Sequence, residues 1–160
     1  MKKTFLIIAL SATAISTHAD AACLPAELCA RISNLVDKPL GTFFGTGDKT
    51  DFNSLCPYVQ NDDESNYVIT VTGDGGANEF ITSNGTTDLP ITVEYEETAQ
   101  PYATLVEATP TTFANPETVD ETCGGAGGAG KVQVTIAEAD MQAATAGTYT
   151  GTIQIVISPD

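Results

Sequence analysis

The end of the chain carries the most regular pattern in the sequence. Residues 146–157 read AGTYTGTIQIVI, and from residue 149 onward two sets of side chains alternate. One set is apolar (Tyr149, Gly151, Ile153, Ile155 and Ile157), whereas the other is polar until Val156. A period of two is typical of a strand with one buried face. No partner strand follows it in the sequence, which leaves open what covers its far edge.

The start of the chain has the features of a secretory signal peptide. A basic MKK precedes a short apolar run at residues 5–10, and small residues follow around Ala19 and Ala21. This order predicts export with cleavage after Ala21, or after Ala19 as the alternative. We therefore expect a signal peptide at residues 1–21 and one domain at residues 22–160. No later stretch approaches about 18 continuous apolar residues, so we expect no membrane span in this domain.

The chain is strongly acidic. Its formal charge is −15, and loss of two lysines and one aspartate with the signal peptide leaves −16. Nucleic acids are bound through clusters of basic side chains. Those that remain are scattered: Arg31, Lys38, Lys49 and Lys131. We therefore expect no nucleic-acid partner and interpret the acidity as that of a soluble exported domain.

Four cysteines in an exported chain predict two disulfides. Of the three possible pairings we favour Cys23 with Cys29, which closes a small loop, and Cys56 with Cys123, which ties an early strand to a late one. Thiolate metal sites use close cysteine pairs, usually with histidine. We predict neither a metal site nor a cofactor.

Catalysis has few candidate residues. The single histidine, His18, lies in the predicted signal peptide, which leaves the domain without triad or histidine–metal chemistry. Paired carboxylates can hydrolyse glycosides, and Glu94, Glu96 and Glu97 are close in sequence. However, Glu94 and Glu96 fall on the outer face of a predicted strand, where solvated charges are usual. We expect no catalytic residues and no enzymatic activity.

Short apolar segments separated by turns recur along the domain. The expected strands, besides the terminal one, are residues 30–36, 52–59, 67–72, 79–82, 89–96, 103–107, 111–114 and 131–137. The expected connections include turns at 37–39 and 61–66, loops at 46–51, 73–76 and 124–130, and a short helix at 138–144. Many short strands with almost no helix predict an all-β sandwich.

Several of these segments occur in an order known from one family. They are residues 40–45 (LGTFFG), Cys56, the Tyr-led strand at 67–72, the strand at 89–95 and the Ala-Gly-Thr-Tyr motif that opens the terminal strand. In this order they resemble the pilin-like domains of archaic chaperone-usher fimbriae and the related spore coat protein U domain.

The resemblance implies an immunoglobulin-like sandwich that lacks its seventh strand, so that an apolar groove lies open beside the terminal strand. In this family a periplasmic chaperone fills the groove, and the N-terminal extension of the next subunit replaces it. The chain would then be secreted through the periplasm to the cell surface or a fimbrium, with chaperone, usher and neighbouring pilus subunits as partners. The residues that would line the groove are Tyr149, Ile153, Ile155 and Ile157. The alternative is that these four side chains fill a complete core.

The chain departs from the family at its other end. A subunit that donates a strand needs an alternating apolar extension, yet only Ala22 precedes Cys23 after the predicted cleavage. Residues 30–36 could be donated only if they were not the first strand of the domain. We therefore expect a subunit that accepts a strand without donating one, at a tip or terminal position. The alternative is a secreted, adhesin-like binding module that does not polymerise and uses the loops at 73–76 or 124–130.

Overall fold

The described part of the chain is almost entirely β-structure. The computed structural model describes residues 7–11, 28–60, 66–76, 79–98, 100–125 and 130–160, and for residues 7–11 it describes the backbone alone. The elements in chain order are β1 (Ile7–Ser11), β2 (Cys29–Ser33), β3 (Lys38–Thr42), β4 (Lys49–Gln60), β5 (Asn66–Gly73), β6 (Phe80–Ser83), β7 (Asp88–Glu97), β8 (Ala103–Thr104), β9 (Thr111–Ala114), the short 3-10 helix η1 (Cys123–Gly125), β10 (Gly130–Ile136), α1 (Glu138–Ala143) and β11 (Thr148–Pro159).

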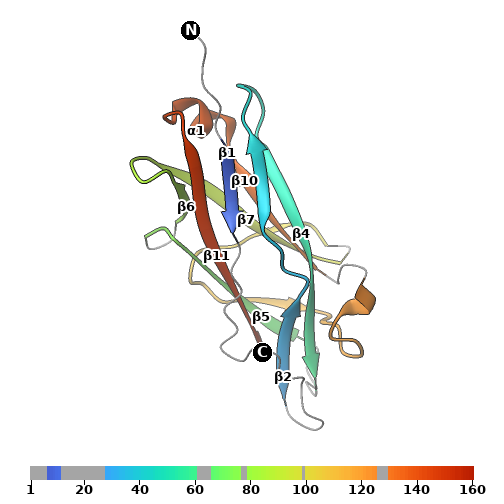
Figure 1. Cartoon of the computed structure of the whole chain (residues 1–160). Helices are drawn as coiled ribbons and strands as arrows, with labels where there is room; N and C mark the ends of the chain where they lie inside the picture. Colours follow the sequence, from blue (N-terminus) through green and yellow to red (C-terminus); the bar gives the residue numbers. More distant parts are fainter. Residues whose placement is uncertain (1–6, 12–27, 61–65, 77–78, 99, 126–129) are drawn as a thin grey trace.

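The strands form two layers (Figure 1). One layer has the order β2-β4-β10-β7, with β8 on the edge of β7. The other has the order β9-β5-β11-β1-β3, and β6 pairs with both β7 and β11, so it links the layers. Among the strands described, the pair of β1 with β11 is parallel and the other pairs are antiparallel. The fold is all-β, as the sequence predicts.

Alternating side chains fill the space between the layers. On β7 the positions that the sequence assigns to the interior are all buried, and the same alternation recurs on β5, β10 and β11. Three of the largest fully buried side chains are tyrosines. The core therefore follows the period-two pattern of the sequence. Its central members are Leu55, Val59, Tyr67, Ile69, Val71, Leu89, Val93, Tyr95, Ile136 and Tyr149.

Most predicted strands are present, with some different bounds. β4 begins at Lys49, inside the stretch predicted as a loop, because β10 pairs with it from that residue onward. β3 covers the predicted turn around Pro39, and proline is tolerated there because, among the described strands, β3 pairs only with β1. The segment predicted at 103–107 is reduced to the two residues of β8. The predicted acidic turn at 61–66 lies outside the described residues except for its last residue, with which β5 begins.

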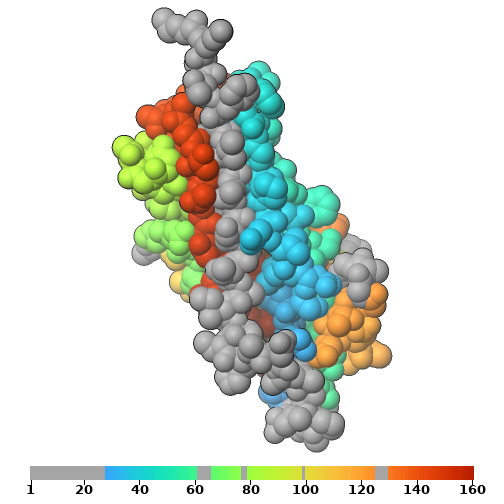
Figure 2. Space-filling view, in the orientation of Figure 1, coloured from blue at the N-terminus to red at the C-terminus, as the bar shows by residue number. Residues whose placement is uncertain are grey.

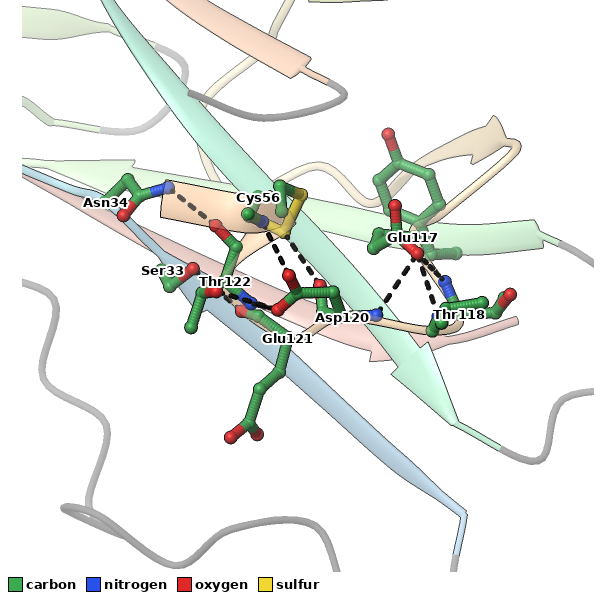
Figure 3. Close-up of a disulfide and its surroundings, with 12 residues drawn as sticks. Ser33, Asn34, Cys56, Glu117, Thr118, Asp120, Glu121 and Thr122 are labelled. Atoms are coloured by element: carbon green, nitrogen blue, oxygen red, sulfur yellow. Dashed lines mark hydrogen bonds between the residues drawn. A yellow bond between two sulfur atoms is a disulfide. The ribbon is translucent and has the colours of Figure 1, made fainter. Parts of the chain in front are cut away.

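One predicted disulfide is present. Cys56 on β4 and Cys123 in η1 are bonded, with their Cα atoms 5.8 Å apart (Figure 3). Cys29 is also disulfide-bonded, whereas Cys23, its predicted partner, lies outside the described residues. The Cys56–Cys123 bond therefore anchors the segment that precedes β10 to β4.

The turn that precedes Cys123 is held by two carboxylates (Figure 3). Glu117 accepts hydrogen bonds from the backbone N–H groups of residues 118–120. Asp120 accepts from the hydroxyl and N–H of Thr122 and from the N–H of Gly124. These bonds favour the charged forms, so the pKa of Glu117 is lowered, first by the N–H of Val119, and the pKa of Asp120 is lowered, first by the Thr122 hydroxyl. The acidic residues of this turn therefore have a structural role.

Candidate functional site

The terminal strand β11 has two edges with different neighbours. On one edge it pairs with β5 along residues 153–159 and meets β6 at Thr150. On the other edge, here called the outer edge, β1 runs parallel to it, with Ile7 opposite Thr148 and Ser11 opposite Thr152. The N–H of Thr152 donates to Asp74, which follows β5. Because successive N–H groups point to opposite sides of a strand, those of residues 153, 155 and 157 point to the outer edge.

The strand β1 also joins β3 to the sheet. It pairs antiparallel with β3, from Ile7 opposite Thr42 to Leu10 opposite Lys38. A bulge between Ile8 and Ala9 leaves Leu40 as the extra residue of β3, and the Leu40 side chain is buried in the core. Among the described strands β3 has no other hydrogen-bonded partner. A single strand thus fills the space between the outer edge of β11 and β3, and we call this space the slot.

The occupant of the slot comes from a segment in which the sequence did not predict a strand. Residues 7–11 overlap the apolar run of the expected signal peptide. Their apolar character was visible, but it is shared by a signal peptide and a buried strand. The predicted cleavage positions after Ala19 and Ala21 fall between β1 and β2, outside the described residues. Within residues 22–160 no described strand pairs with the outer edge of β11 or with β3.

The outer edge continues beyond β1 above a small apolar cavity. No described strand pairs with this edge after Thr152. The cavity beside it is lined from β11 by Ile153 and Ile155 and from β10 by Val132 and Val134. Leu35 and Val36, which precede β3, close it from the other side. Along β11 the slot spans residues 148–152, and the cavity follows at Ile153 and Ile155. Figure 2 shows β11 in red and the segment that begins at residue 28 in blue on the same face of the molecule.

The rim of the cavity is apolar but held by polar contacts. Phe52 and Val36 are each about half exposed, at 50% and 52%. Asn53 donates a hydrogen bond to the Val36 carbonyl at 3.1 Å. Lys38 lies 4.0 Å from the Asp51 carboxylate and 6.0 Å from the centre of the Phe52 ring. Apolar side chains are thus exposed beside the part of this edge with which no described strand pairs.

The four predicted groove residues lie on the inward face of β11. Tyr149, Ile153 and Ile155 are buried, and Ile157 is half-buried against the same core. Two of them, Ile153 and Ile155, line the cavity. The Tyr149 hydroxyl instead donates to the Thr145 carbonyl at 3.0 Å, beyond the start of the strand. The set therefore divides into a cavity-lining pair in the middle of β11 and two residues nearer its ends.

The carboxylates considered for catalysis are separated by their environments. Glu94 accepts from Gln133, and Glu96 accepts from Lys131 on the outer face of β7. The hydrogen bond from Lys131 is the first cause of the lowered pKa of Glu96. Glu97 is buried and accepts from the N–H of Ala114 and the side-chain amide of Asn115. All three carboxylates therefore join strands or loops to one another.

The described residues contain neither a metal-binding cluster nor a membrane-crossing helix. No cluster of three or more His, Cys, Asp or Glu side chains there could hold a metal ion. Nor does the described part contain a helix of the length and apolarity that a membrane crossing requires.

Comparison with known proteins gives a likeness in structure but none in sequence. No family model and no curated protein matches the chain. A solved structure described as the chaperone–tip adhesin complex of CFA/I fimbriae biogenesis is similar, with a TM-score of 0.52 and 15% identity. This chain has an all-β, pilin-like fold.

The structural match includes nearly all of this chain but less than half of the matched chain. It covers 96% of this chain and 42% of the matched chain, so the pilin-like chain spans less than half the length of that protein. At this identity the likeness shows the fold. The resemblance to spore coat protein U rests on the sequence motifs.

Proposed function

We propose that this protein is an exported structural subunit of a bacterial surface fimbrium and that it accepts a strand from a chaperone or a neighbouring subunit. One observation carries the proposal: between β11 and β3 lies a slot whose only described strand, β1, comes from the predicted signal peptide. After cleavage, residues 22–160 would have two unpaired strand edges facing one another. A strand from another chain can hydrogen-bond to both.

The chain is better suited to accept a strand than to donate one. The first described strand after the predicted cleavage, β2, pairs with β4 from Cys29 opposite Gln60 to Ser33 opposite Cys56. The domain uses this segment itself, so it is not free to extend into a neighbour. This pairing supports the proposed position at a tip or terminus of the fimbrium, with usher-guided assembly through the periplasm, and we propose no catalytic role.

The folding of residues 22–160 tests strand acceptance. Refolded alone with its disulfides, this chain is expected to be loosely folded, and a peptide of residues 4–14 is expected to give a 1:1 complex that unfolds cooperatively. The same peptide carrying Ala9→Pro is the control, because proline cannot donate to the ladder. A stable two-state monomer that binds neither peptide would contradict strand acceptance. Immunogold labelling of the source bacterium with antibodies against residues 22–160 would then place the protein on filaments or exclude it from them.

An adhesin-like binding module is the second candidate, and a cleft beside β7 favours it. The cleft runs along β7 from its ladder with β6 toward its pairing with β8, and Phe80, Ile91 and Leu105 contribute to its apolar lining. Glu79 and Asp88 contribute acidic side chains to the lining. Binding of the purified protein to a glycan array, lost on Ile91→Trp, would support this candidate. A blank array together with filament labelling would reject it.

A further inference from the structure

We infer that the predicted signal peptide holds the slot closed before it is cleaved, with residues 7–11 acting as an occupant supplied by the same chain. This inference rests on the proposed strand-accepting function and adds a form of control to it. The occupant is β1, and the state of the slot depends on one peptide bond.

The two ladders of β1 show how completely it occupies the slot. All five of its residues have partners on β11, and four have partners on β3. Ala9, in the middle, lies opposite Thr150 on one side and opposite Pro39 on the other. An incoming strand needs the same backbone groups of β11 and β3. It can therefore pair with them only after β1 leaves.

The predicted cleavage site lies in the segment that connects β1 to the first described strand of the domain. The predicted cleavage after Ala21 lies between β1 and β2 and interrupts no described strand. Hydrolysis breaks the amide bond between Ala21 and Ala22, water supplies the hydroxyl of the new Ala21 carboxyl group, and the nitrogen of Ala22 becomes a free amine. The products are a short peptide that carries β1 and a domain that carries both walls of the slot.

The chain connection determines how strongly β1 competes. A strand tethered by a short connection acts at an effective concentration of about millimolar. A partner strand present at micromolar concentration is therefore excluded while the connection is intact. Once it is cut, β1 is diluted to the concentration of the protein itself, and partner strands compete on equal terms. Cleavage thus converts a closed subunit into one that can accept a strand.

The test uses the full chain with a recognition site for a sequence-specific protease inserted between Ala21 and Ala22. The folded chain is divided into an uncut and a cut sample, and a fluorescent peptide of residues 4–14 is added to each at micromolar concentration. Fluorescence anisotropy is expected to show binding to the cut sample and at least about tenfold weaker binding to the uncut sample. The uncut Ala9→Pro variant is expected to bind like the cut sample, because its own β1 cannot complete the ladders.

The other outcomes would contradict either the closed slot or the proposed function. Equal binding to cut and uncut samples would show that the signal peptide does not close the slot, while strand acceptance would stand. Binding to neither sample, together with unchanged stability after cutting, would contradict the proposed function itself. If the Ala9→Pro variant does not fold, the comparison of cut and uncut samples still decides the inference.

Discussion

The hydroxyl groups of Tyr67 and Tyr95 lie 2.8 Å apart inside the core, where they hydrogen-bond to each other. Tyr67 is on β5 and Tyr95 is on β7, so this bond joins the two layers. Their rings meet edge to face, and Phe113 on β9 packs against both. Gly130 lies so close to Tyr95 that a Cβ at this position would collide with the Tyr95 hydroxyl.

Removing one of these hydroxyls leaves the other buried without its partner. Tyr67→Phe and Tyr95→Phe are each expected to lower the free energy of unfolding by about 1–3 kcal/mol. The double variant is expected to lose less than the sum of the two, because no orphaned hydroxyl remains. Denaturant unfolding of the four proteins measures the coupling. Strictly additive losses would show that the two hydroxyls do not interact.

The same pair predicts a loss of stability in alkali. Burial raises the pKa of Tyr67 to about 12 and also raises the pKa of Tyr95. Above pH 10 the unfolded chain releases these protons while the folded chain keeps them, so stability falls between about pH 10 and pH 12. The slope is up to about 1.4 kcal/mol per pH unit for each tyrosine. Urea midpoints across this range are expected to fall less steeply for the double Phe variant.

The disulfide between Cys56 and Cys123 is expected to stabilise the fold strongly. It closes a loop with a sequence separation of 67 residues. Replacing both cysteines with serine is expected to lower the free energy of unfolding by about 4 kcal/mol. Asp120→Asn, in the adjacent turn, serves as the comparison and is expected to cost less, because it keeps the covalent link. A double serine variant as stable as the parent would contradict this role.

Gly151 allows β11 to approach β6 closely. A Cβ at this position would lie 2.6 Å from the Ile81 carbonyl oxygen and 2.9 Å from the Thr82 side chain. Gly151→Val is therefore expected to destabilise the protein by about 1–3 kcal/mol. The adjacent Thr150→Val change, on the exposed face, is expected to stay within about 0.5 kcal/mol of the parent. Thermal unfolding of the two variants gives the comparison, and equal losses would show that the close approach is unimportant.

Periodicity predicted most of the sandwich because one face of each strand is buried. The inward residues of β7 and β11 and the short helix α1 follow from patterns within a few residues. The Cys56–Cys123 pair was the favoured choice among the three pairings that four cysteines allow. The slot depends on long-range pairing. Residues 7–11 have the composition of both a signal peptide and a strand, and sequence gives no register between them and β3 or β11. Ile153 and Ile155, which line the cavity, were among the predicted groove residues. Val36 and Phe52 were not, because they are far from β11 in sequence and no local pattern relates them to it.

The most direct test of the slot is amide hydrogen exchange in the cleavable full chain. With β1 in place, those amide groups of residues 38 and 40–42 that point toward β1 are expected to exchange slowly. After cleavage and removal of the β1 peptide, they are expected to lose protection, and added strand peptide is expected to restore it. Residues 130–136 of β10 are the internal control, since they pair with β4 and β7 in every state. Unchanged protection of these β3 amide groups after β1 is removed would contradict a strand-accepting slot between β11 and β3.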